Sequence, residues 1–174
     1  MKLVVGLGNP GVEYSDTRHN VGFIAANMMA GKFGVSFSNN KKFNAEIAEA
    51  KIGRKKIILA KPLTFMNESG KSVQAIINFF KIKPSDIIVA HDDKDIALGE
   101  YKIQFNRSSA GHNGVQSIID HLGTQNFFRL RLGIKPLKQI SDTADYVLGK
   151  ISKNEKQKLD EILPDATDKL LQSL

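Results

Sequence analysis

The first twenty residues constrain the fold most strongly. Leu3–Val5 is a short apolar run, and Gly6 and Gly8 follow it, which is the pattern of a buried strand that ends in a tight turn. After Thr17, a good N-cap residue, apolar side chains recur at helical spacing. The opening of the chain therefore predicts a strand, a glycine-rich turn and a helix.

Three polar or aromatic side chains accompany this turn: Asn9, Tyr14 and His19. In α/β sheets, ligands bind outside the carboxyl ends of the strands. An amide, an aromatic ring and an imidazole at such a position predict a functional site.

The glycine spacing allows an alternative, because Gly6, Gly8 and Gly11 satisfy the dinucleotide-binding pattern G-x-G-x-x-G. That pattern expects an acidic residue about 20 residues further on. Residues 25–33 contain no Asp or Glu, and the segment after Met28 is a poor candidate for a second parallel strand. A nicotinamide enzyme is therefore the weaker reading, and we expect no cofactor.

Length and composition set the broad class. With 174 residues, the chain is expected to form one domain, residues 1–174, with a full core. The absence of Cys excludes disulfides, thiolate catalysis and Cys-ligated zinc. The N-terminal apolar run is too short for a signal peptide, and no run reaches membrane-span length. We expect a soluble cytoplasmic protein that does not bind a membrane.

The net charge of +7 predicts a polyanionic partner. Residues 32–61 carry eight Lys and Arg against two Glu, and residues 99–138 carry six against one Glu and one Asp. Ordinary solvated lysines explain any single position, whereas two clusters indicate contact with nucleic acid. A basic RNA-binding module without catalysis is thus one candidate function.

The remaining periodicity predicts an α/β fold, a single-domain mixed twisted β-sheet flanked by helices. Residues 39–42 are expected to form a loop, and the last helical segment, from about residue 152, to be broken or kinked at Pro164. The helix that begins near residue 67 is expected to have Asn67 or Ser69 as its cap. Strands are expected at 2–6, 45–52, 56–60, 87–90, 101–105 and 128–134, and helices from 21, from 67, at 115–122 and from about 152.

His19 and Asp92 form the candidate catalytic pair. If the strands at 2–6 and 86–91 are neighbours, both side chains can meet above the sheet. A carboxylate beside an imidazole orients the ring and stabilises the imidazolium that forms when the ring takes a proton from water. The plainer readings are a packing histidine and a solvated carboxylate at a strand end.

A divalent metal is the alternative for the acidic run His91-Asp-Asp93 with Asp95. Strand alternation divides these side chains between two faces of the sheet, so we expect no metal.

Water is the expected nucleophile, because the chain has no Cys and no G-x-S-x-G elbow. Asn67 and Asn113 can be plain helix-cap or turn residues. Amide side chains both donate and accept hydrogen bonds, however, which suits recognition of a peptide beside a scissile ester.

Several motifs, in order from residue 2 to about 155, resemble those of bacterial peptidyl-tRNA hydrolases. The resemblance implies a monomeric, metal-independent esterase of the cytoplasm that releases peptides from peptidyl-tRNA dropped by ribosomes. The motifs are Gly6-Leu-Gly-Asn-Pro-Gly11, Thr17-Arg-His-Asn20, Lys42-Phe-Asn44, Lys61-Pro62, Thr64-Phe-Met-Asn67, Ser69-Gly-Lys-Ser72, His91-Asp-Asp93, Gly111-His-Asn-Gly114, Phe128-Arg-Leu-Arg-Leu-Gly-Ile134 and Tyr146-Val-Leu-Gly149.

The resemblance also assigns roles to individual residues. His19 matches the family's catalytic base, Asp92 the carboxylate that supports it, and Asn9 the residue linked to telling N-blocked from free aminoacyl-tRNA. Tyr14, Phe65, Asn67 and Asn113 match substrate-binding positions, and Arg131 and Lys102 match contacts to tRNA phosphate.

The chain departs from the family pattern in three places. Arg107 and Ala110 replace glycines in the run before the Gly111-His-Asn-Gly114 motif, which makes that loop stiffer and more basic. Lys94 stands where the family usually has an apolar residue, and Pro164 interrupts the final helical segment of a comparatively short chain.

Overall fold

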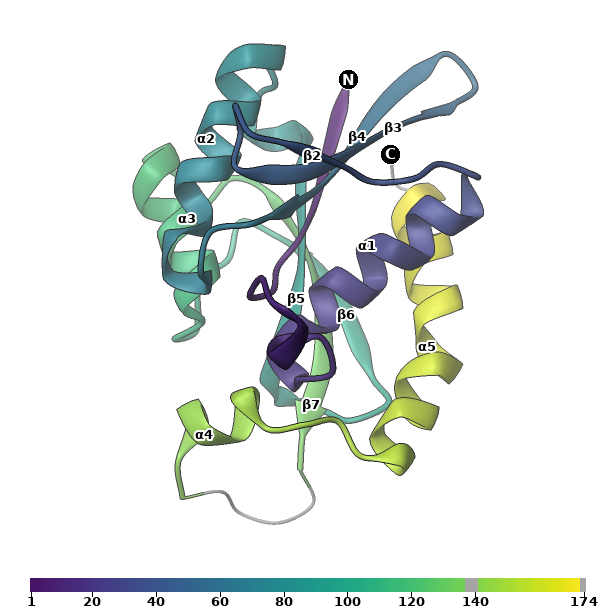
Figure 1. Ribbon diagram of the computed structural model, residues 1–174, viewed down its shortest axis with the longest axis vertical. Helices are drawn as coiled ribbons and strands as arrows, with labels where there is room; N and C mark the ends of the chain where they lie inside the picture. Colours follow the sequence, from purple (N-terminus) through teal and green to yellow (C-terminus); the bar gives the residue numbers. More distant parts are fainter. Residues whose placement is uncertain (137–140, 173–174) are drawn as a thin grey trace.

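A seven-stranded mixed sheet forms the centre of the molecule (Figure 1). The structure is a computed structural model that describes residues 1–136 and 141–172, so Lys138 of the second basic cluster lies outside the described residues. The strand order is β2-β3-β4-β1-β5-β7-β6. The strands are β1 (Lys2–Gly6), β2 (Ser38–Asn40), β3 (Ala45–Ile52), β4 (Lys55–Pro62), β5 (Ile87–Ala97), β6 (Tyr101–Phe105) and β7 (Phe128–Lys135).

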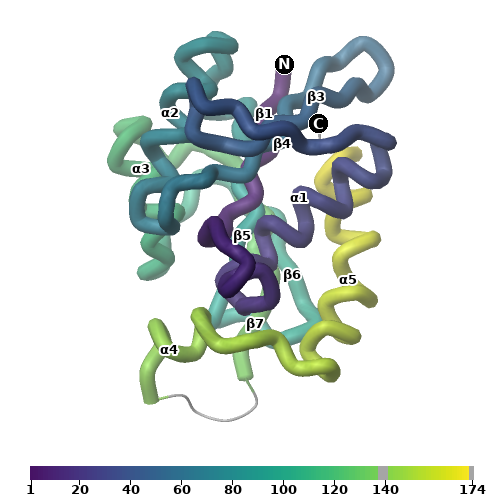
Figure 2. The backbone as a smooth tube through the Cα atoms, in the orientation of Figure 1, coloured from purple at the N-terminus to yellow at the C-terminus, as the bar shows by residue number. Residues whose placement is uncertain are grey.

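Helices cover both faces of the sheet. Helices α1 and α5 lie on one face and α2 and α3 on the other, while α4 lies beyond the carboxyl ends of the central strands (Figures 1 and 2). No helix in the described ranges has the length and apolarity needed to cross a membrane. The helices are α1 (Val21–Lys32), α2 (Ser69–Phe80), α3 (Asn113–Leu122), α4 (Thr143–Leu148) and α5 (Lys153–Gln172), with 3-10 turns η1 (Val12–Tyr14), η2 (Arg18–Asn20), η3 (Met66–Glu68) and η4 (Pro84–Asp86).

Strand β1 occupies the middle of the sheet. It pairs in parallel with β4 on one side and with β5 on the other, and β5 pairs in parallel with β7. The strands at 2–6 and 86–91 are neighbours, as expected, with Val5 opposite Val89 and Gly6 opposite Ala90. The carboxyl ends of four parallel strands therefore share one edge, above which ligands bind in such sheets.

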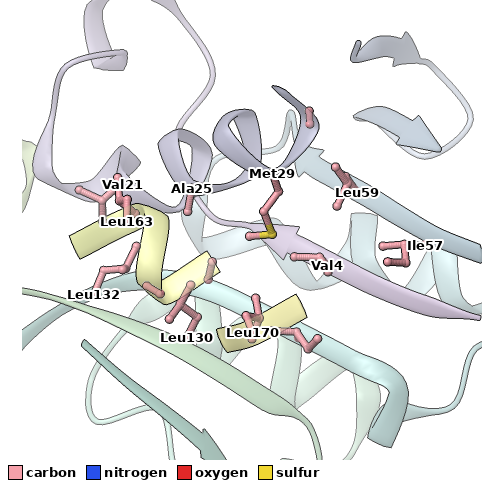
Figure 3. Packing of buried hydrophobic residues seen from close by; sticks show 14 of the residues in the cluster. Val4, Val21, Ala25, Met29, Ile57, Leu59, Leu130, Leu132, Leu163 and Leu170 are labelled. Atoms are coloured by element: carbon pink, nitrogen blue, oxygen red, sulfur yellow. The ribbon is translucent and has the colours of Figure 1, made fainter. Parts of the chain in front are cut away.

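The two faces of the sheet carry separate apolar cores. On one face, α1 and α5 pack over β1 and β7 through Val4, Met29, Leu130 and Leu163, all fully buried (Figure 3). On the other face, α2 and α3 bury the alternate strand residues. Burial on both faces explains why the central strands are nearly continuous apolar runs.

Helix α1 lies unusually close to the end of β1. A Cβ added to Gly22 would lie 2.4 Å from the carbonyl oxygen of Ala90 and 2.5 Å from the backbone nitrogen of Leu7. A Cβ added to Gly6 would lie 2.3 Å from the carbonyl oxygen of Gly22. These contacts are with backbone, which cannot move aside as a side chain can, so both positions require glycine. The glycines of the opening motif thus serve helix–strand packing.

The start of α5 is tied to η2. The guanidinium of Arg18 donates from Nε and Nη2 to the Glu155 carboxylate, at 2.7 and 2.9 Å, and lies 4.2 Å from the ring centre of Tyr146. Burial alone would raise the pKa of Glu155, but hydrogen bonds from Arg18 and Ser152 hold it below its ordinary value. Glu155 and Ser152 also form a capping box that begins the helix.

Some local predictions were wrong. Residues 38–40 form a short edge strand where a loop was expected, and α4 was not expected at all. Helix α2 has Glu68 at its N-cap position, after the turn η3, rather than Asn67 or Ser69. Strand β5 extends well beyond residue 90.

Helix α5 is not broken at Pro164. A proline at this position leaves the carbonyl of Asp160 without its helical partner. Asp160 is exposed, so water can take that place.

Gly22→Ala tests the close approach of α1. We expect a loss of about 1–3 kcal/mol in the free energy of unfolding, because the added methyl group meets backbone atoms on two sides. Gly31→Ala, in the same helix and with no atom within 4 Å of the added Cβ, is the matched control. It should instead gain about 0.5–1 kcal/mol, since Ala is the better helix former. Urea unfolding measures both, and equal effects would contradict the packing argument.

Glu155→Gln tests the ion pair separately from the helix cap, because Gln can still complete a capping box. We expect a loss of about 1.5–3 kcal/mol in the free energy of unfolding at neutral pH, as Arg18 loses a charged hydrogen-bond partner. A carboxylate whose folded pKa is depressed stabilises above its unfolded pKa and loses that effect as the pH falls. The difference between the two proteins should therefore shrink below pH 4.5, the unperturbed value for Glu155. A constant difference across that range would exclude the ion pair as its cause.

Candidate active site

His19 and Asp92 meet above the carboxyl end of β1. Turn η2 presents His19, and Asp92 projects from β5 on the face that α1 covers. Nδ1 of His19 lies 2.8 Å from Oδ1 of Asp92, and both residues are buried. A carboxylate only accepts, so Nδ1 carries the proton and donates it, which leaves Nε2 of His19 as the basic nitrogen.

A second imidazole shares the same carboxylate oxygen. Nε2 of His112 lies 2.8 Å from Oδ1 of Asp92, and the two imidazole rings of His112 and His19 are 4.9 Å apart. His112 is the N-cap of α3, where its Nδ1 accepts the backbone N–H of Val115 at 3.3 Å. Since Nδ1 accepts, Nε2 carries the proton and donates to Asp92. The sequence analysis missed His112, although it lies inside the Gly111-His-Asn-Gly114 motif.

The surroundings of Asp92 keep its carboxylate ionised. Burial would raise the pKa of Asp92, but the electrostatic interaction and hydrogen bond with His112, together with the hydrogen bond from His19, outweigh burial and hold it far below its ordinary range. Nδ1–H of His91 donates to the backbone oxygen of Asp92 at 2.7 Å. Full burial is the main cause that lowers the pKa of His91, which favours the neutral form of this third imidazole.

A cavity of about 260 Å³ opens beside the pair. His19, Asp92 and His112 line it, and α4 contributes further lining residues from a segment far away in the sequence. Of the predicted substrate-binding residues, Asn113 lies in this cavity. The lining residues are His19, Asp92, Asp93, Lys94, Ser109, Ala110, Gly111, His112, Asn113, Thr143, Ala144 and Val147.

Asn9 is held in place by hydrogen bonds to Asn20, the residue that follows His19, and to Met66. Its backbone N–H donates to Oδ1 of Asn20 at 2.8 Å, and Nδ2 of Asn20 donates back to its carbonyl at 3.0 Å. Oδ1 of Asn9 accepts the backbone N–H of Met66 at 2.8 Å. This fixes the orientation of the amide, so Nδ2 is the group that Asn9 can offer to a ligand. Asn9 lines a neighbouring groove of about 270 Å³ rather than the cavity.

Tyr14, Phe65 and Asn67 lie outside the lining of that cavity. The rings of Tyr14 and Phe65 meet edge to face at 6.5 Å, and Phe65 is 57% exposed. Asn67 is exposed and directly follows Met66, whose sulfur lies 2.4 Å from the position of a Cβ added to Gly114. The turn η3 therefore packs on the beginning of α3, the helix whose first residue, Asn113, lines the cavity.

Arg131 and Lys102 face each other across β6 and β7. Nε of Arg131 donates to Oδ2 of Asp93 at 2.7 Å, and Nη1 donates to Oε1 of Gln104. Lys102 is exposed. The two residues thus lie on one surface, as directly opposed antiparallel residues must, and Arg131 already has a carboxylate partner.

Among the residues that the structure describes, the group able to hold a metal is His19, Asp92 and His112, whose ligand atoms lie within 4.8 Å of one another. Both imidazoles, however, direct an N–H toward Asp92, and a metal would require lone pairs there. The run suspected from sequence is not gathered around one point, because His91 and Asp93 lie on the opposite face of β5 from Asp92. The imidazole nitrogens that face Asp92, and the Asp92 oxygen between them, are thus already engaged in hydrogen bonds within the protein.

The family model and the relatives that match this chain all belong to the same family. The family model for peptidyl-tRNA hydrolase matches residues 3–174. A peptidyl-tRNA hydrolase of Mycoplasma mycoides is 48% identical over 155 residues, which cover 89% of this chain and 83% of the relative. One of Fusobacterium nucleatum is 45% identical over 175 residues, which cover 100% of this chain and 90% of the relative.

A solved structure agrees with the sequence relatives. The crystal structure of peptidyl-tRNA hydrolase from Acinetobacter baumannii superposes with a TM-score of 0.91 at 37% identity, covering 97% of this chain and 86% of that one. The fold class predicted from sequence is therefore confirmed. With a family match across nearly the whole chain, relatives above 40% identity and the same fold, this chain belongs to the peptidyl-tRNA hydrolase family.

Proposed function

We propose that the chain hydrolyses the ester between the C-terminal carboxyl of a peptide and the tRNA 3′ ribose by using His19 to activate water. The observation that carries this mechanism is the 2.8 Å hydrogen bond from His19 to Asp92. It directs the basic Nε2 of the ring away from Asp92, in a residue that lines the cavity. General bases of this kind contribute about 10²–10⁴-fold to a rate.

In the first step, Nε2 of His19 takes a proton from water as the water oxygen attacks the ester carbonyl. Asp92 stabilises the imidazolium and does not take the proton, because its pKa lies far below that of an imidazole. In the second step, the tetrahedral intermediate expels the 3′ oxygen of the ribose, and the imidazolium returns its proton to that oxygen. The products are the peptide acid and the free tRNA, and the ring is restored.

His112 acts on the same carboxylate as a positioning residue. Its hydrogen bond to Oδ1 of Asp92 and its helix-cap bond to Val115 connect the catalytic carboxylate to α3. The orientation of Asp92, and through it that of His19, then depends on the packing of a whole helix.

The residues assigned to the substrate offer amide and aromatic groups. Asn113 in the cavity and Asn67, on the turn that packs against α3, offer amides to the peptide and to the ester carbonyl, and Tyr14 with Phe65 offers an aromatic surface to the peptide or the 3′ end. Arg131 and Lys102 are assigned to tRNA phosphate, contacts that position the substrate.

The setting proposed for this reaction is the cytoplasm, where ribosomes release peptidyl-tRNA. No metal is assigned a role, because the hydrogen bonds among His19, Asp92 and His112 occupy the donors a metal would need. A monomer suffices, since every residue assigned above comes from one chain.

His19→Ala tests the mechanism. We expect turnover to fall by about 10²–10⁴-fold, the contribution of a general base, while the affinity for tRNA stays within about two-fold. The measurement is release of the acetylated amino acid from N-acetyl-aminoacyl-tRNA with EDTA present, together with tRNA binding by fluorescence. Near-normal turnover in the variant would refute the proposal. If the unaltered chain binds tRNA in a salt-sensitive manner but hydrolyses no substrate, it is instead an RNA-binding module without catalysis.

His121→Ala is the matched control for that experiment. His121 lies in the last turn of α3, where its Nδ1–H donates to the carbonyl of Ser117 at 2.8 Å, and it does not line the cavity. Its loss should leave turnover unchanged.

Asn9→Asp tests substrate discrimination. The substitution keeps an oxygen for the N–H of Met66 and removes the Nδ2 donor, so the fold of the turn is preserved while the ligand-facing group changes. We expect the preference for N-acetyl-aminoacyl-tRNA over free aminoacyl-tRNA, measured as a ratio of kcat/KM, to fall by about ten-fold or more, since one charged or well-oriented hydrogen bond is worth roughly 1.5 kcal/mol. An unchanged ratio would remove Asn9 from this role.

A further inference from the structure

Arg129 is a buried cation without a matching partner. It lies on β7 between β5 and β6 and is only 2% exposed, which makes it the largest fully buried side chain of the described residues. Within residues 1–136 and 141–172, its Nε finds no hydrogen-bond partner. A buried charge of this kind costs folding free energy unless a ligand compensates it.

Positive charges outnumber negative charges around Arg129. Burial, followed by repulsion from Arg131 and a smaller repulsion from Arg107, outweighs the attraction of Asp93 and lowers the pKa of Arg129 to about 10. Asp93 is already bound to Nε of Arg131 at 2.7 Å. Three guanidinium groups therefore share one carboxylate, and the excess charge belongs to Arg129 and Arg107 rather than to Arg131.

Arg107 places part of this charge at the surface. It is exposed and lies in the loop that follows β6, where the backbone N–H of Asn106 donates to the carbonyl of Phe127 at 3.2 Å, directly before β7. The same loop continues to Ser109 and Ala110 in the lining of the cavity. The exposed part of the excess charge, on Arg107, therefore lies in the loop that connects β6 with the lining of the cavity.

We propose that Arg107, backed by Arg129, binds a phosphate group of the tRNA on this surface. This inference rests on the proposed function and adds a contact beyond Arg131 and Lys102. Guanidinium groups bind phosphate through paired N–H donors. Arg107 makes the exposed contact, and Arg129 supplies an uncompensated charge beneath it, where low dielectric makes that charge act more strongly than a solvated one.

Arg107→Gln is the first test, with Lys83→Gln as its control. Lys83 is also exposed, but it lies outside both basic clusters and directly before η4, at the amino end of β5. Both variants lose one positive charge. We expect only Arg107→Gln to weaken tRNA binding by about 3–10-fold and to reduce the slope of log affinity against log salt by about one, as the loss of one phosphate contact does.

Hydrolysis and inorganic phosphate give separate readouts. With N-acetyl-aminoacyl-tRNA, Arg107→Gln should raise KM and leave kcat unchanged, since the phosphate lies away from the reacting ester. Millimolar inorganic phosphate should raise the Tm of the unaltered chain and of Lys83→Gln, and raise it less in Arg107→Gln, because a ligand stabilises the state that binds it.

Arg129→Met tests the buried charge. If Arg129 stabilises the fold, its replacement should lower Tm. If it is a buried cation without a partner, its replacement should not lower Tm. We expect Tm equal to or above that of the unaltered chain, with weaker tRNA binding. A lower Tm would overturn the role of Arg129.

The outcomes separate the two proposals. If Arg107→Gln matches Lys83→Gln in salt slope and KM, the phosphate site is refuted even where hydrolysis is normal. If phosphate protects through Arg107 but the tRNA slope is unchanged, the site takes free phosphate and the tRNA contact is refuted. If the unaltered chain binds tRNA with the expected slope but hydrolyses no substrate, the catalytic proposal fails and the phosphate site stands.

Discussion

The active site depends on one buried carboxylate that accepts hydrogen bonds from two imidazoles. Asp92 sits at the carboxyl end of the parallel part of the sheet, and the two rings reach it from different elements, η2 and the beginning of α3. An ionised carboxylate in this position is tolerable only because both donors are held in place. The packing of α1 and α3 on opposite faces of the sheet therefore sets the geometry at one oxygen atom.

Much of this arrangement was accessible from sequence because its signals are local. The strand, the glycine turn and the helix of the opening follow from apolar spacing, and the pairing of β1 with β5 brings His19 to Asp92. His112 was missed because its role depends on the path of the loop after β6, which returns the start of α3 to the strand ends. Local spacing carries no information on such a return.

Charged residues were harder to interpret than apolar ones. Sequence clusters correctly marked residues 99–138 as basic, but they could not show which cations are already neutralised. In the structure Arg131 is paired with Asp93, whereas among the described residues Arg129 is buried without an equivalent partner.

The sequence did not predict strand β2 or helix α4. Strand β2 has three residues and α4 has six, and such short segments show too little periodicity to be recognised. Tertiary contacts decide their conformation.

The central position of β1 has a consequence for how the chain acquires its structure during synthesis. Strand β1 leaves the ribosome before both of its partners and cannot pair until β4 and β5 follow, and β5 obtains its second neighbour only with β7. Loop closure over such separations slows folding and leaves strand edges exposed meanwhile. The nascent chain is thus expected to remain without its catalytic geometry until most of its length has been translated.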